Sequence, residues 1–203
     1  MDRRQAIQRT ALVLGYSLSA PAIMGILKGC KATPDLAFKP VFLNPDQAAI
    51  IAEVAEIIIP KTDTPGAKDA GVPAFIDLMV KDCYAQPDQE RFTKGIADLD
   101  AAASKAHGNG FLDCSPEQQQ ELVHTMHKDA LAAMKSPEPP KDKPFILMVK
   151  ELTLLGFFTS EPGATQVLSY SAVPGQYQGC VPVGAKVQDT EGTEFTIGKT
   201  WAT

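Results

Sequence analysis

The sequence predicts a mainly α-helical protein with one compact domain of about five helices, an extended C-terminal tail and a candidate small hairpin in that tail. Apolar residues recur at helical spacing in successive segments, and two of those segments begin with a capping-box signature. The helical pattern stops near residue 160, where Gly and Pro become frequent. We therefore divide the chain into an N-terminal segment (1–29), a tether (30–43), a helical domain (44–160) and a tail (161–203).

Composition limits the class of protein. The 203 residues are 44% hydrophobic and only 7% aromatic, which suits a single globular domain with a modest core. The chain holds 24 acidic side chains against 19 Lys and Arg, for a net charge of −5. Because binding to a phosphate backbone needs a basic surface, we expect no nucleic-acid partner.

Residues 1–29 have the layout of an export signal. A basic start precedes an apolar stretch over residues 10–27. The adjacent pair Arg3 and Arg4 resembles a twin-arginine signal, which is read by a translocase that moves folded proteins. An ordinary secretory signal is the alternative, whereas a permanent membrane helix is disfavoured because Gly, Ser and Pro interrupt the stretch.

The cysteine at position 30 predicts where this signal ends. Leu27-Lys28-Gly29-Cys30 resembles a lipobox, in which the cysteine is acylated and becomes the mature N-terminus. A cut after Ala20-Pro21-Ala22 is the competing interpretation. We expect a periplasmic protein that is anchored to the membrane surface as a lipoprotein through Cys30, without a spanning helix.

The first helix of the domain is predicted over residues 45–59. Asn44-Pro45-Asp46-Gln47 combines an N-cap side chain, a proline at the first helical position and a glutamine that closes a capping box. Apolar residues follow at helical spacing, and Pro60 ends the helix.

Residues 60–73 are rich in turn formers and form either an ordered or a flexible loop. The small side chains of this loop suit close approach to another surface. The candidate partner contacts are therefore Thr62, Asp63, Thr64, Pro65 and Gly66, with Tyr177 from the tail.

Three further helices follow the loop. Apolar spacing resumes from Ala74 to Cys83 and again from about Gln89 to Gly108. Ser115-Pro116-Glu117-Gln118 repeats the capping-box signature and predicts a helix that carries its apolar stripe to Met134.

A surface loop over 136–144, with four prolines, separates these helices from residues 145–159, which are apolar on nearly every side. Such a helix is buried either at the centre of the domain or by a partner. In the tail, residues 187–197 predict the hairpin, around Glu191-Gly192. A tail with so little core of its own needs a surface to lie on.

The chain contains no Gly-rich dinucleotide fingerprint, phosphate loop, nucleophile elbow or Cys-x-x-Cys pair. His124 and His127, with Glu121 or Asp129, are candidate metal ligands, and carboxylate pairs such as Asp98-Asp100 and Glu117-Glu121 are weak candidates for acid–base catalysis. A solvated helix face is the ordinary interpretation of both. We expect no catalytic, cofactor-binding or metal-binding residue in this chain.

The remaining cysteines suggest disulfides, because thiols oxidise after export. Cys83 and Cys114 end neighbouring helical segments and are a candidate internal pair. Cys180 is then left over in the tail, which makes it a candidate for a disulfide to another chain. A buried reduced thiol, or a bond from Cys180 to one of the other two, remains the alternative.

Two segments carry a resemblance to a known family. They are Ile57-Ile58-Ile59-Pro60 with the following Thr62-Asp63-Thr64-Pro65-Gly66-Ala67 and Ala70-Gly71-Val72-Pro73, and the tail motif Val173-Pro174-Gly175-x-Tyr177-x-Gly179-Cys180-Val181-Pro182. With the twin-arginine-like signal, they resemble the gluconate 2-dehydrogenase subunit 3 family.

The resemblance implies a non-catalytic small subunit that stabilises a large FAD-dependent dehydrogenase of the glucose-methanol-choline (GMC) family and escorts it for export. The large subunit acts on sugars or sugar acids and holds the FAD and the catalytic bases, and a cytochrome c is a candidate electron acceptor. An intersubunit disulfide of the family maps to Cys180. The alternative is a stand-alone periplasmic lipoprotein that binds a ligand or acts as a scaffold.

Overall fold

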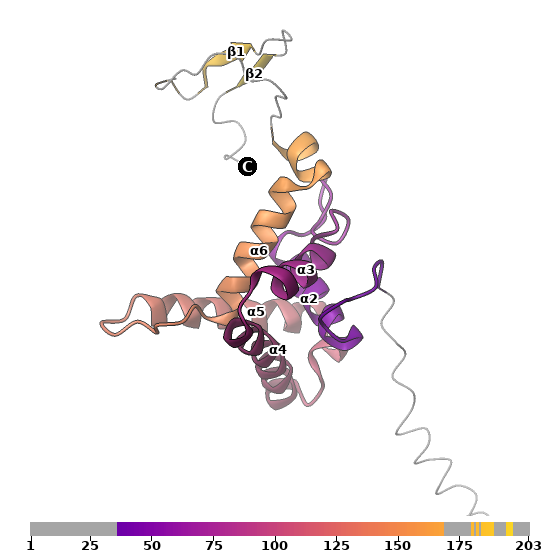
Figure 1. Ribbon diagram of the computed structural model, residues 1–203, viewed down its shortest axis with the longest axis vertical. Helices are drawn as coiled ribbons and strands as arrows, with labels where there is room; N and C mark the ends of the chain where they lie inside the picture. The colour runs from indigo at the N-terminus through magenta and orange to yellow at the C-terminus, as the bar shows by residue number, and fades with distance from the viewer. Residues whose placement is uncertain (1–35, 169–179, 181, 183, 189–193, 197–203) are drawn as a thin grey trace, which may run out of the picture. The chain divides into compact units, whose positions relative to one another are not determined.

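The computed structural model describes residues 36–168, 180, 182, 184–188 and 194–196. Five α-helices account for most of this part of the chain, so the prediction of a mainly helical domain is confirmed (Figure 1). They are α2 (Pro45–Ile58), α3 (Val72–Cys83), α4 (Gln86–His107), α5 (Pro116–Met134) and α6 (Phe145–Thr159). A 3-10 turn, η1 (Phe111–Asp113), precedes α5, and a π-helical turn, η2 (Gly163–Val167), follows α6.

Both predicted capping boxes form. At the start of α2 the Asn44 side chain accepts the Gln47 N–H at 2.9 Å, and Gln47 Oε1 accepts the Asn44 N–H at 3.1 Å. Ser115 and Gln118 make the same reciprocal pair at the start of α5. Each box satisfies backbone donors that have no partner inside the helix, which fixes the helix start.

Two helices begin earlier than the apolar spacing predicts. α3 starts at Val72 rather than Ala74, and α4 starts at Gln86 rather than Gln89. Each contains a proline in its first turn, where the missing N–H costs no hydrogen bond. Polar residues before the first apolar residue of α4 therefore belong to the helix as well.

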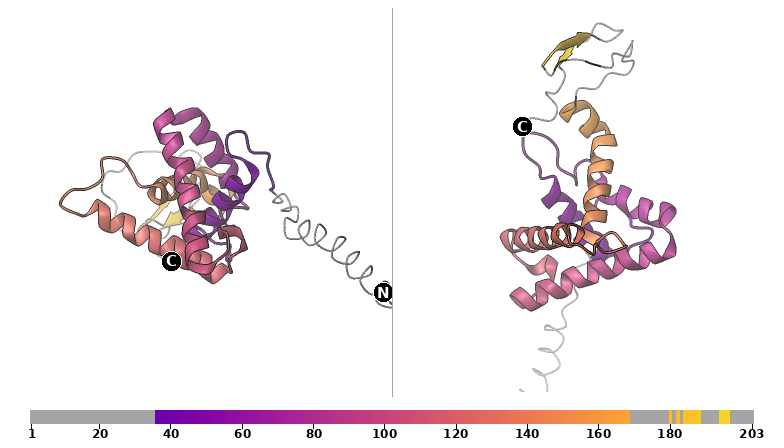
Figure 2. Two further views of the ribbon diagram at one scale, coloured as in Figure 1. Left: turned by 90° about the horizontal axis from the view of Figure 1, so that it is seen from below. Right: turned by 90° about the vertical axis from the view of Figure 1, so that its left-hand side faces the viewer.

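Helix α6 lies at the centre of the helical domain and packs against α2, α3, α4 and α5. Its first residue, Phe145, meets Phe92 of α4 edge-on, with ring centroids 5.3 Å apart. The approach depends on Gly95, because a Cβ there would lie 2.2 Å from the Phe145 ring. Of the two alternatives for this apolar helix, burial within the domain accounts for the residues that pack against these four helices (Figures 1 and 2).

The end of the predicted tether packs onto the domain through a buried carboxylate. Asp77 of α3 is only 1% exposed and accepts the N–H groups of Val41 at 2.6 Å and Leu43 at 2.7 Å, with Phe42 N–H between them at 3.2 Å. Leu43 belongs to the hydrophobic core. The folded domain therefore includes residues ahead of Asn44, where we had placed only a tether.

The C-terminal part of α5 and the following loop extend beyond the packed helices (Figures 1 and 2). Leu131 and Met134 near the end of α5 are 38% and 39% exposed. The loop itself is exposed over most of its length, as predicted for residues 136–144.

The described part of the tail contains an antiparallel hairpin of β1 (Lys186–Gln188) and β2 (Glu194–Thr196). The register pairs Lys186 with Thr196, Val187 with Phe195 and Gln188 with Glu194. The strands flank Glu191-Gly192, where the sequence predicted the turn.

Candidate functional site

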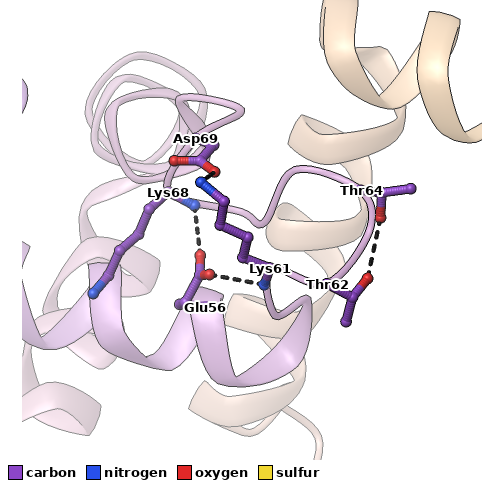
Figure 3. Close-up of polar contacts among 6 residues, drawn as sticks. All are labelled: Glu56, Lys61, Thr62, Thr64, Lys68 and Asp69. Atoms are coloured by element: carbon purple, nitrogen blue, oxygen red, sulfur yellow. Dashed lines mark hydrogen bonds and ion pairs between the residues drawn. The ribbon is translucent and has the colours of Figure 1, made fainter.

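The loop between α2 and α3 is ordered by one carboxylate. Glu56, in the last turn of α2, accepts the backbone N–H groups of Lys61 and Lys68, each at 2.9 Å (Figure 3). The Ala67 N–H also donates to the Ile59 carbonyl at 2.9 Å. Of the two alternatives left open for residues 60–73, the structure shows the ordered loop.

Two solvent-exposed ion pairs also involve residues of this loop. Lys61 Nζ lies 2.8 Å from Asp69, and Lys68 Nζ lies 2.7 Å from Glu53 of α2. The hydrogen bond and the charge of Asp69 raise the pKa of Lys61 above its ordinary value. These pairs are exposed to solvent, so each contributes little to the stability of the loop.

Gly66 is the one loop position where a side chain has no room. An added Cβ would lie 2.2 Å and 2.7 Å from the two Glu56 carboxylate oxygens and 2.7 Å from the Lys61 backbone nitrogen. Only glycine, which has no Cβ, can approach Glu56 this closely. This explains why position 66 of the loop is a glycine.

The predicted contact residues of the loop differ in their solvent exposure. Thr62 and Asp63 are exposed, Thr64 and Pro65 are partly buried, and Gly66 is buried. The Thr62 N–H donates to the Thr64 carbonyl at 3.0 Å, which forms a tight turn at the tip. The tip therefore contains a local backbone hydrogen bond and exposes Thr62 and Asp63 to solvent.

The described cysteines are separate thiols. Cys83 is exposed at the end of α3, and its Sγ lies 3.8 Å from Met79 Sδ. Cys114 is buried, and its Sγ donates to the Gly110 carbonyl at 3.4 Å. The candidate bond between Cys83 and Cys114 is therefore not formed, because the two thiols lie in different environments with different partners. Cys180 is exposed and unbonded.

A groove of about 520 Å³ lies between the end of α2, α5 and the first half of α6. Its apolar lining consists of Ile57, Ile58, Val123 and Ile146. Its polar lining consists of Glu117, Gln120, Glu121, His124, His127 and Lys150. The volume is within the usual range of ligand pockets, and the mixed lining suits an amphipathic occupant.

His127 and Lys150 form a polar pair in this groove. Lys150 Nζ lies 3.2 Å from His127 Nε2, and both residues are partly buried. Partial burial lowers the pKa of His127, and the nearby charges of Lys150 and His124 lower it further. At neutral pH the imidazole is therefore uncharged and accepts a hydrogen bond from the ammonium group.

The two histidines singled out by their spacing do not assemble a metal centre with the neighbouring carboxylates. Within residues 36–168 and the short described stretches of the tail, no three His, Cys, Asp or Glu side chains are placed to hold a metal ion. His124 is exposed, and His127 is turned to Lys150.

Helix α6 leaves part of its apolar surface uncovered. Leu154 is 37% exposed and Leu155 is 46% exposed, whereas residues such as Val149 and Leu152 are buried. The domain therefore leaves part of the apolar surface of α6 exposed, and a second protein chain could bury that surface. No helix among the described residues is long and apolar enough to cross a membrane.

Several predicted site residues lie outside the described residues: Arg3 and Arg4 of the export pair, the lipidation candidate Cys30, and Tyr177. Conversely, the sequence analysis missed the roles of Glu56, Asp77 and Lys150. Glu56 and Asp77 stand in helical segments, where a carboxylate is expected at the surface. The one sequence signal for Lys150 is that it and Glu151 are the only charged residues in an apolar helical segment.

The features described so far define a small helical domain with an ordered polar loop, an amphipathic groove and a partly uncovered apolar helix. The sequence profile described as gluconate 2-dehydrogenase subunit 3 matches residues 45–175, more than half of the chain. The chain therefore belongs to the gluconate 2-dehydrogenase subunit 3 family, and the resemblance inferred from the sequence is confirmed. No curated protein and no solved structure matches the chain.

Proposed function

We propose that this chain is the non-catalytic small subunit of a periplasmic dehydrogenase, and that it binds, stabilises and escorts for export a large FAD-dependent subunit of the GMC type. The observation that carries the proposal is the family match over residues 45–175. The large subunit acts on a sugar or sugar acid and holds the flavin and the catalytic bases. A cytochrome c is the proposed electron acceptor.

The surface of the described domain supports a role in binding a protein. A partner that buries the exposed side chains of Leu154 and Leu155 gains a binding free energy of about 25 cal/mol per Å² of apolar surface removed from water. The exposed tip at Thr62 and Asp63 belongs to a loop that is already ordered by hydrogen bonds, which reduces the entropy cost of binding there. We propose that Thr62, Asp63, Thr64 and Pro65, together with Tyr177, contact the large subunit, whereas the predicted contact at Gly66 is buried against Glu56 and shapes the loop.

Cys180 is the proposed site of a disulfide to the large subunit. Its exposure leaves the thiol accessible to a second chain. The periplasm supports oxidation of two thiols to a disulfide, with the electrons passed to the thiol-oxidising machinery of that compartment. Non-reducing electrophoresis of the complex should show a band that Cys180→Ser removes and that Cys83→Ser, also at an exposed thiol, retains.

Co-expression with the candidate large subunit tests the proposal. The chain, tagged after Thr203, should capture a yellow partner with flavin absorbance. Replacing Arg3 and Arg4 with Lys should keep both subunits in the cytoplasm, and Cys30→Ala should release the complex from the membrane fraction. A colourless monomer that is exported alone would contradict the proposal and favour the stand-alone lipoprotein.

A further inference from the structure

We infer that the groove between α2, α5 and α6 binds a segment of the large subunit that places an apolar side chain next to a carboxylate. This inference rests on the proposed function and names the partner chemistry for one of its surfaces. Three observations support it: the lining of the groove, the partly buried ammonium group of Lys150, and the exposed residues near the groove.

The base of the groove selects an apolar group. Its lining includes Ile57 and Ile58, which are partly exposed, and Val123 and Ile146, which are nearly inaccessible to solvent, so Ile57 and Ile58 offer most of the hydrocarbon that an occupant can cover. A sugar or sugar acid needs hydrogen-bonding partners for each hydroxyl group, which this base does not offer. An aliphatic or aromatic side chain of a partner protein suits the base because it removes the same hydrocarbon from water.

Lys150 selects a carboxylate beside that apolar group. Its ammonium group is partly buried and contacts the uncharged His127, and no carboxylate of the described residues lies within ion-pair distance. By contrast, Lys61, Lys68 and Lys143 each pair with an acidic side chain. A partly desolvated cation with a neutral partner gains from an incoming carboxylate, which forms a charge-assisted hydrogen bond.

The remaining charges orient the segment. Glu117 and Glu121 line the groove from the N-terminal half of α5, whereas His127 lies farther along the same helix beside Lys150. One end of the groove therefore repels a carboxylate and the other attracts it. The acidic side chain of the partner enters at the Lys150 end, and the part of the segment near Glu117 is neutral or basic.

Two other exposed features lie close in sequence to residues that line the groove. Leu154 lies one helical turn beyond Lys150 on the same side of α6 and is 37% exposed. At the other side, Ile58 precedes the exposed Thr62 by four residues, which span at most about 14 Å. One partner subunit can therefore cover the groove, the α6 residue and the loop tip together.

Charge reversal tests the carboxylate contact. Lys150→Glu should weaken binding of the intact chain to the large subunit at least tenfold, and Lys150→Arg should retain binding within threefold. Lys128→Glu, an equal charge change at an exposed α5 residue outside the groove, should have less than a threefold effect. Thermal unfolding of each isolated chain checks the fold. Equal affinities for Lys150→Glu and Lys128→Glu, with both chains folded, would overturn the inference.

Photo-crosslinking identifies the occupant. A benzophenone amino acid in place of Gln120, which is exposed and lines the groove, should attach to a large-subunit peptide that carries Asp or Glu near an apolar residue. The same group in place of Lys94 on α4 should not attach to that peptide. Attachment to residues 169–203 of this chain, to a second copy, or to no peptide in an intact complex would overturn the inference. If the wild-type chain fails to bind the large subunit, the proposed function fails too.

Discussion

Substitution of Gly66 by alanine should disorder the loop between α2 and α3, because the new methyl group competes with Glu56 for space. The Cβ would lie 2.2 Å from one carboxylate oxygen, whereas ordinary contact begins near 3.4 Å. The carboxylate would have to move by about 1 Å, which stretches its 2.9 Å bonds to Lys61 N–H and Lys68 N–H beyond useful hydrogen-bond length. The Lys61 backbone nitrogen, 2.7 Å from the Cβ, would also have to shift.

The expected cost follows from those two bonds. Hydrogen bonds to a charged group contribute about 1.5–3 kcal/mol each, and solvent exposure of this loop places them at the low end. We expect Gly66→Ala to lower the free energy of unfolding by about 2–3 kcal/mol. For a domain of this size the melting temperature should fall by about 6–9 °C.

A double-mutant cycle gives the sharper measurement. Urea unfolding would be measured for the wild-type chain, Gly66→Ala, Glu56→Ala and the double variant. Without the Glu56 carboxylate, alanine at position 66 meets only the Lys61 backbone, so its cost should fall by at least about 1 kcal/mol. The reasoning is refuted if Gly66→Ala costs less than about 0.5 kcal/mol or if the two substitutions are additive.

Two further predictions concern buried and partly buried ionisable groups. Asp77→Ala removes the acceptor for the N–H groups of residues 41–43, so the segment should detach and the domain should lose about 3 kcal/mol by urea unfolding. Asp82→Ala, at an exposed position of the same helix, should cost less than about 0.5 kcal/mol. For His127 the folded-state pKa lies below the unfolded one, so the unfolded chain binds more protons and stability should fall as pH drops below about 6.5. Lys150→Met should raise the imidazole midpoint measured by NMR titration, and an unchanged midpoint would contradict the assigned contact.

The parts of the fold that the sequence predicted depend on local interactions. The capping boxes at Asn44 and Ser115 each join two residues that are three apart in the sequence, so the residue types alone identify these boxes. Apolar spacing similarly located the five helices of the described residues to within a few residues, and the residue types Glu191-Gly192 predicted a hairpin between the segments that form β1 and β2. In each case the partners are neighbours in the sequence, which a pattern can reveal.

The site depends on partners that are far apart in the sequence. Asp77 binds backbone groups 34 to 36 residues away, and Glu56 binds Lys68 twelve residues away. The residue type of an acceptor says nothing about which backbone groups will face it, so these carboxylates could not be distinguished from surface charges. The groove is similar, because its lining comes from three helices whose packing the sequence does not specify.

The apolar sequence of α6 illustrates why a buried helix and a binding helix look alike before the structure is known. Its inward residues pack against four helices, which accounts for Val149 and Leu152. That packing does not account for Leu154 and Leu155, since they face solvent and add little to the stability of the isolated domain. Nor does it account for Lys150, whose partly buried charge finds only a neutral partner. Both departures from a self-sufficient core lie along one helix, and Lys150 also lines the groove. A partner that brings hydrocarbon and a carboxylate to this region satisfies both at once, and the family to which the chain belongs is that of a dehydrogenase subunit.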